Sequence, residues 1–424
     1  MKKKLRIVFV WTMISVLLQY GGYYILNSQV QKVISPPPAA STQPITTQLK
    51  ANIPAIDLTD VKISYAKDYL AYAENGTLKV FNLKKNKVVF QKAPPSDNDK
   101  SLGVLMYQWL PDRNTLLYFY AKKNPDPVNY VTVYPPNTTI QVPASASGSI
   151  SVLPKTEDPN QTIVHEVPKT VTKEVTAAPH LEKRYGNPQI TELYSLDLPN
   201  SDEDTAPDDR FNQTIDAFPA GGNIENLVVS TSTNLMYLTV KDASRELLLE
   251  IDVMKNVRTL SQSGETIDNM AASDRYGTLF LDSKEGGIHR IIALDGAKRQ
   301  IISRNSNDGI LGIKDGKVYI GEVQNNELIK IETTPDLIHM TNNSSLTTEW
   351  EGAIPFNNSS CTLIGAKGQV IVYDQQKAYI DTAGRLTEVK LHGDENYISD
   401  DGAELIQLTK QGTSTLVEVQ PLQS

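Results

Sequence analysis

The feature that most limits the fold is a repeated pattern of short strands that begins at Val61. Alternating apolar and polar residues form these segments, and Gly, Pro, Asn and Asp separate them. The first unit contains Val61–Ser64, Tyr69–Ala73, Thr77–Leu83 and Lys87–Gln91. Asn75-Gly76 joins the second and third segments, and Asn-Gly favours a tight hairpin because both central residues of a type I′ turn need positive φ.

The same unit recurs along the chain, and long helical periodicity is absent after residue 26. Seven candidate units of up to four strands each predict an all-β fold, a β-propeller of six or seven blades. One terminal unit is short of strands, so a strand from the other end of the chain is expected to complete it. The later units begin at Leu105, Leu227, Met270, Ile310, Leu363 and Asn396.

One turn carries a resemblance to a known family. The run WLPDRNTLLY, Trp109–Tyr118, resembles the W-S-P-D-G-x-x-L-x-Y blade signature of TolB-like and dipeptidyl-peptidase-IV N-terminal propellers. Ser399–Leu405 and Ser273–Phe280 are weaker copies. In such turns the Asp side chain closes the turn and Gly takes the positive φ. Leu110 stands where the signature has Ser, and Arg113-Asn114 stands where it has Gly. The resemblance implies the propeller fold alone.

A long insertion interrupts the second unit. Ala121–Gln189 is rich in Pro, Thr, Val and Ser, and it contains alternating runs at Tyr130–Tyr134, Thr138–Val142, Ile150–Leu153 and Thr162–Val167. A loop of this length inside a compact domain is usually functional or disordered. Two interpretations stay open: an extended β-arm that docks a partner or pairs strands, and a disordered surface loop.

The N-terminus has the pattern of a membrane anchor. Residues 1–6 are basic, and Ile7–Leu26 carries no charge over 20 residues, enough to cross a hydrocarbon core of about 30 Å. Tyr20, Tyr23 and Tyr24 gather at its far end, where aromatic rings favour the interface. The basic residues predict a cytoplasmic tail, a single transmembrane helix at 7–26 and an extracytoplasmic remainder.

The alternative for this segment is a cleaved signal peptide. Its apolar region would be Ile7–Leu18, but the bulky residues after it offer no small-residue cleavage site. Both interpretations place the rest of the chain outside the cytoplasm. Residues 27–56, which include Pro36-Pro37-Pro38, predict a Pro/Ser/Thr-rich linker, and 57–424 are assigned to the propeller.

Charge limits the partners. The net charge is −8, and the residues after Arg6 hold 37 basic and 49 acidic side chains. Binding to nucleic acid needs clusters of Lys and Arg, and none occurs after residue 6, so no nucleic-acid partner is expected. The expected partners are the membrane, through the N-terminal helix, and a protein or a cell-envelope polymer.

The residue types that commonly carry chemistry are scattered. Cys361 is the single cysteine and is expected to be a buried small residue. No histidine pair has metal-ligand spacing, and His289, on a predicted strand, is interpreted as a blade-face or core residue. No metal, cofactor or catalytic residue is assigned. The histidines are His165, His180, His289, His339 and His392.

Two further features have structural interpretations. An acidic stretch is interpreted as a solvated turn, because it lacks the regular spacing and the Gly of a calcium loop. Its members are Asp202, Glu203, Asp204, Asp208 and Asp209. Trp109 ends a strand beside a turn and is expected to pack between blades.

These observations favour a non-enzymatic function. The chain has no G-x-S-x-G elbow, so an α/β-type serine hydrolase is unsupported, and the family resemblance covers the half that is not catalytic. The sequence predicts a binding or scaffolding module for an envelope component or a protein. The alternative is an envelope hydrolase or lyase for glycan or peptide, with convergent carboxylates, or a His with a carboxylate, in the propeller funnel.

Overall fold

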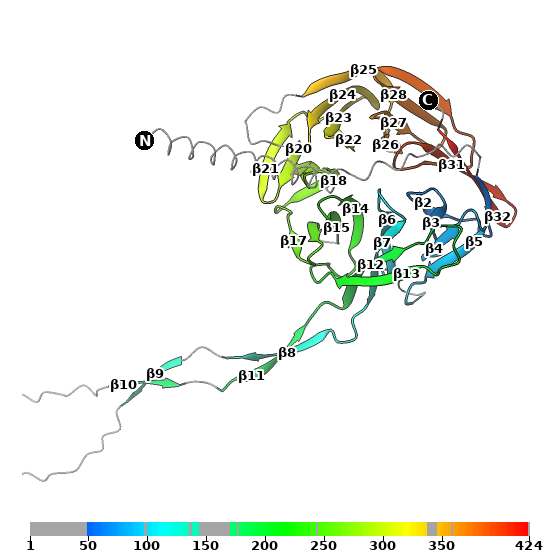
Figure 1. Cartoon of the computed structure of the whole chain (residues 1–424). Coiled ribbons are helices and arrows are strands. Elements are labelled where there is room, and N and C mark those ends of the chain that lie inside the picture. The colour runs from blue at the N-terminus through cyan, green and yellow to red at the C-terminus, as the bar shows by residue number, and fades with distance from the viewer. Residues whose placement is uncertain are drawn as a thin grey trace, which may run out of the picture.

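A computed structural model describes residues 49–422 except 97–98, 100, 135–137, 144–169, 176–177, 243–244, 337–345 and 358. The described residues form seven four-stranded antiparallel sheets, arranged as the blades of a ring (Figure 1). The all-β propeller prediction is confirmed, with seven blades. Within the described part of the chain, no helix has the length and apolarity needed to span a bilayer. The predicted membrane helix at 7–26 lies outside the described residues.

The first three blades follow one another in sequence. Blade 1 contains β2 (Thr59–Ile63), β3 (Tyr69–Glu74), β4 (Thr77–Asn82) and β5 (Lys87–Lys92). Blade 2 contains β6 (Gly103–Trp109), β7 (Thr115–Lys123), β12 (Gln189–Asp197) and β13 (Asp208–Thr214). Blade 3 contains β14 (Asn223–Ser230), β15 (Leu235–Lys241), β16 (Glu246–Asp252) and β17 (Val257–Thr259).

The next three blades repeat the same order. Blade 4 contains β18 (Glu265–Ala272), β19 (Leu279–Glu285), β20 (Ile288–Asp295) and β21 (Lys298–Ser303). Blade 5 contains β22 (Asp308–Lys314), β23 (Lys317–Gln324), β24 (Glu327–Pro335) and β25 (Thr347–Pro355). Blade 6 contains β26 (Cys361–Ile364), β27 (Val370–Tyr373), β28 (Lys377–Thr382) and β29 (Arg385–Lys390).

Blade 7 joins the two ends of the described chain. It contains β30 (Glu395–Ile398), β31 (Glu404–Gln411) and β32 (Ser414–Pro421), and β1 (Leu49–Ile53) completes it by pairing with β32. The expectation that a strand from one end of the chain completes the unit at the other end is therefore confirmed. β1 lies inside the stretch 27–56, so the linker prediction is wrong for these five residues: Ala51 and Ile53 are buried between blades 7 and 1. Residues 27–48 lie outside the described residues.

The core consists of apolar layers between neighbouring blades. Each blade buries both faces because a sheet in a ring meets a neighbour on each side. Trp109 shows the arrangement: its ring is 2% exposed, packs with Tyr69 and Leu78 of blade 1, and donates Nε1–H to the Lys62 carbonyl at 3.0 Å. The prediction that Trp109 packs between blades is confirmed.

The insertion in blade 2 forms an arm. β8 (Val128–Val133) pairs with β11 (His180–Tyr185), and farther along β9 (Thr138–Pro143) pairs with β10 (Thr170–Val175). The ribbon continues from the β7–β12 hairpin and extends away from the ring (Figure 1). The β-arm interpretation is confirmed for these strands, whereas the runs at Ile150–Leu153 and Thr162–Val167 lie outside the described residues.

Candidate functional site

Antiparallel order gives the ring two distinct faces. Each first strand begins on the face that also holds the hairpin between the second and third strands and the segments between blades; we call this the linker face. The opposite face holds the hairpin between the first and second strands; we call it the hairpin face. The arm and the β19–β20 hairpin therefore lie on the linker face, and the turns with the family signature lie on the hairpin face.

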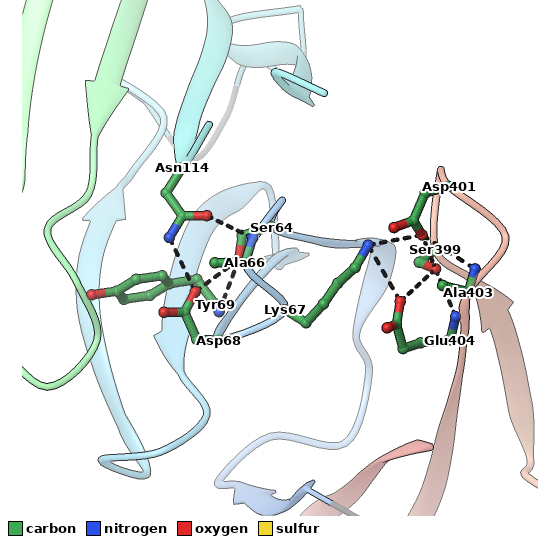
Figure 2. Close-up of polar contacts among 10 residues, drawn as sticks. All are labelled: Ser64, Ala66, Lys67, Asp68, Tyr69, Asn114, Ser399, Asp401, Ala403 and Glu404. Carbon is green, nitrogen blue, oxygen red and sulfur yellow. Dashed lines mark hydrogen bonds and ion pairs between the residues drawn. The ribbon is translucent and has the colours of Figure 1, made fainter. Parts of the chain in front are cut away.

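On the hairpin face, each signature turn binds the turn of a neighbouring blade. Asn114 of blade 2 accepts the Ala66 N–H at 2.9 Å and donates to Asp68 of blade 1 at 3.1 Å (Figure 2). Asp274 of blade 4 accepts the Thr231 hydroxyl of blade 3 at 2.9 Å. These side chains thus hold blades together.

The contact between blades 7 and 1 has the same character and is buried. Lys67 is 8% exposed and places its Nζ 2.9 Å from Asp401 and 3.4 Å from Glu404 (Figure 2). Asp401 also accepts the Ser399 hydroxyl at 2.6 Å and the Ala403 N–H at 3.2 Å. Burial raises the pKa of Asp401, but Lys67 and these hydrogen bonds outweigh burial and hold it below its usual range. The Asp closes its turn, as predicted, and Gly402 takes a φ of +69°.

A second polar group joins the first strands of blades 1 and 2 to blade 7. Lys62 donates to the Tyr107 carbonyl at 2.8 Å and to Gln108 at 3.0 Å, and its Nζ lies 3.6 Å from Asp60. Gln108 donates in turn to Asp400 at 3.0 Å. Burial raises the pKa of both Asp60 and Asp400. Both carboxylates thus lie within a lysine–amide network.

Cys361 is exposed, so its predicted burial is wrong. It is the first residue of β26, and burial increases along this strand until Ile364, which packs between blades 5 and 6. Its position at the strand start, outside the apolar layer, explains the difference.

The acidic stretch divides into a loop and a strand. Asp202, Glu203 and Asp204 are exposed in the loop before β13, as predicted for a solvated turn. The turn interpretation is wrong for Asp208 and Asp209, which belong to β13, an outermost strand whose solvated face tolerates charge. Asp209 accepts the Tyr118 hydroxyl at 2.6 Å.

Among the described residues, the linker face carries a histidine–carboxylate cluster in blade 4. Asp268, Asp282 and His289 come from β18, β19 and β20, and one potential ligand atom from each lies within 4.8 Å of the others. His289 Nε2 contacts Asp282 Oδ1, and both side chains are 10% exposed. Burial raises the pKa of Asp282, and His289 offsets this only in part.

The blade-face interpretation of His289 is confirmed, but its partners were not predicted. Asp282 and His289 flank the Gly286-Gly287 turn, so an antiparallel hairpin places them diagonally on one face. That spacing is the signal that sequence reasoning missed. His180 and His392 are exposed elsewhere, and His165 and His339 lie outside the described residues.

The arm carries exposed aromatic and apolar side chains. Opposite residues of an antiparallel pair share a face, so Tyr130 lies on the same face as Leu181 and Tyr185. These three side chains, which we call the arm stripe, are 66%, 68% and 78% exposed. Lys183 lies among them with its Nζ 4.9 Å from the centre of the Tyr185 ring. Large apolar side chains gathered on a solvated ribbon are typical of an interaction surface.

Comparisons with known proteins give fold-level likenesses alone. No family model matches the chain, and no curated protein matches its sequence. The β-propeller domain of Cps50 (Swd1) from Myceliophteria thermophila is 10% identical, covers 88% of this chain and 100% of its own, and has a TM-score of 0.48. The SCAP WD40 domain from fission yeast is 8% identical, with 88% and 94% covered and a TM-score of 0.41. A Pyrococcus horikoshii acylaminoacyl peptidase is 11% identical, with 79% and 45% covered and a TM-score of 0.38. The propeller class of this chain therefore rests on its own strand pairing.

Proposed function

We propose that this chain is a membrane-anchored, extracytoplasmic scaffold, non-enzymatic, which binds a protein partner through the arm of blade 2. The β-propeller fold is compatible with a binding module, and the arm stripe is the observation that carries the proposal. Fully burying an apolar side chain such as Leu contributes roughly 1.5–3 kcal/mol, so burial of the stripe would favour binding of a partner.

The backbone of the arm supports the same function. In the described part of the ribbon, β8 pairs with β11, so the outer edge of each strand is open. An open edge can accept an added strand through main-chain hydrogen bonds, while pockets on the partner receive alternate side chains. A protein partner supplies both a strand and apolar pockets, whereas a polymer of sugars supplies neither.

The alternative, an envelope hydrolase or lyase, has weaker support. Asp60 and Asp400 have raised pKa values, which is common in active sites. Lys62 lies beside Asp60, however, and Gln108 binds Asp400, so a structural network explains both carboxylates.

Site-specific photo-crosslinking in cells that produce the full chain tests the arm. A photoreactive residue at Tyr130 is expected to trap one discrete protein, and the same residue at Val131, on the opposite ribbon face, serves as the matched control. Leu181→Ser with Tyr185→Ser is expected to reduce the product at least tenfold. Equal crosslinking from both faces, or none from Tyr130, would contradict the proposal.

The anchor is tested separately. Deleting residues 2–26 is expected to release the chain from the membrane fraction, because this deletion removes the uncharged 20-residue segment. Retention of the shortened chain in the membrane fraction would exclude this anchor without affecting the crosslinking result.

A further inference from the structure

The three side chains of the blade 4 cluster converge from three strands at the interface with blade 5. Asp282 and His289 continue the row of Phe280 and Ile291, which form the apolar layer between these blades. A side chain added at Gly309, on the first strand of blade 5, would meet Asp282 Oδ2 at 3.4 Å. The row thus changes from apolar residues to a buried carboxylate and imidazole as it reaches the linker face.

Asp268 reaches the cluster through an irregularity in its strand. The register between β18 and β19 shifts between Ile267 and Asn269, so Asp268 is the extra residue of a bulge. Bulges redirect a side chain and recur beside functional sites. Asp268 is exposed and pairs with Lys284, a flexible and half-exposed side chain that can move away from it.

The imidazole of His289 is incompletely bonded. Its Nδ1 is buried and has no hydrogen-bond partner in the described part of the chain. Nε2 faces Oδ1 of Asp282, a carboxylate that can accept its proton. A metal ion bound at Nε2 would take the place of that proton and would require the tautomer with the ring proton on Nδ1. In that tautomer a lone pair and two carboxylates face one another, and a cation between them removes the repulsion.

We propose that Asp268, Asp282 and His289 form a binding site for a divalent transition-metal cation, with Zn²⁺ as the best-fitting ion. One imidazole nitrogen and two carboxylate oxygens are ligands that Zn²⁺ accepts, and three protein ligands leave the fourth position for water. Ca²⁺ prefers six to eight oxygen ligands and fits this set poorly. Because Nδ1 has no acceptor among the described residues, the affinity should be about 10–100-fold below that of a site with such an acceptor.

Titration calorimetry with Zn²⁺ on the chelator-treated full-length chain tests the site. We expect one Zn²⁺ per chain, a rise in Tm with Zn²⁺, and no comparable effect of Ca²⁺ or Mg²⁺. Asp268→Asn and His289→Ala should each weaken binding at least about 100-fold, because loss of a ligand exceeds the effect of losing an outer partner. Asp295→Asn, at an exposed end of β20, and His392→Ala are matched controls that should bind normally.

Two results would overturn the site: Zn²⁺ binding that Asp268→Asn and His289→Ala leave unchanged, or no binding in the wild-type chain. Asp268 is exposed, so Asp268→Asn decides the matter even if His289→Ala fails to fold. Zinc anomalous scattering from a soaked crystal gives a second measurement, with a peak expected between Asp282 and His289.

Discussion

Two buried charged clusters, one on each face of the ring, differ in how completely their charges are paired. On the hairpin face, Lys67 binds Asp401 and Glu404, and both carboxylates also lie within hydrogen-bond distance of the Ser399 hydroxyl. On the linker face, Asp282 has His289 as its partner, and the other nitrogen of this imidazole is buried without one in the described residues.

The pKa directions follow this difference. Burial raises both carboxyl pKa values, but in Asp401 the lysine and the hydrogen bonds reverse the shift, whereas in Asp282 the shift remains upward. A completely paired cluster has nothing left to bind and serves the fold. An incompletely paired cluster leaves a buried carboxylate without a lysine or arginine in contact among the described residues, which distinguishes a candidate site from a structural ion pair.

Breaking the completely paired cluster around Lys67 should have the largest effect on stability. Lys67→Met leaves Asp401 and Glu404 partly buried without their cation, at the contact between blades 7 and 1, and should lower the free energy of unfolding by about 3–5 kcal/mol. Urea unfolding measures the change. Lys84→Met, which removes an exposed pair with Asp202, is the control and should change stability by less than about 1 kcal/mol. Equal effects of the two variants would refute the ring-closing role of Lys67.

The two acidic residues should respond to pH with opposite signs. The folded pKa of Asp401 is lowered, so its charge stabilises the fold above the unfolded value near 3.8, and this stability is lost as pH falls through the folded pKa. The folded pKa of Asp282 is raised, so the stability from its neutral form is present below about 3.8 and is lost as pH rises through the folded pKa.

At pH 7 in chelator, Asp401→Asn should therefore destabilise the chain by about 1–3 kcal/mol, whereas Asp282→Asn should be neutral or stabilising by up to about 1 kcal/mol. Denaturant unfolding from pH 3 to pH 8 measures both differences, which should shrink toward acid pH. A loss in Asp282→Asn as large as that in Asp401→Asn would show that Asp282 is as well paired as Asp401.

The sequence predicts the completely paired cluster around Lys67 better than the incompletely paired cluster around His289. The Ser399–Glu404 turn is local in sequence, so its Asp and Gly can be identified by type and spacing. Lys67, however, reaches Asp401 only after β1 closes the ring, and no local pattern signals that contact. The predicted burial of Cys361 is wrong for a related reason, because burial depends on where the strand begins relative to the apolar layer.

The incompletely paired cluster forms because a hairpin and a bulge together bring its three side chains close to one another. The Gly286-Gly287 turn predicts that Asp282 and His289 share a face, but the bulge that brings Asp268 to them has no signature in the sequence. The arm shows the same limit. Its alternating runs predict β8 and β9, but the partner of β8, β11, begins 47 residues after Val133, and the partner of β9, β10, begins 27 residues after Pro143. Pairing at such distances is set by the register of the folded ribbon.

The smallest effect should come from substituting Lys284, the cation beside the incompletely paired cluster. Lys284 and Asp268 are each 48% exposed, so Lys284→Met in chelator should change the free energy of unfolding by less than about 1 kcal/mol. Zinc binding should instead tighten by up to about fivefold, because the ammonium competes with the metal for Asp268 and about 1 kcal/mol corresponds to that factor. Calorimetry measures the affinity, with Lys298→Met as a control that removes an equal charge from β21. Weaker zinc binding in Lys284→Met alone would mean that Lys284 orders Asp268 and does not compete for it.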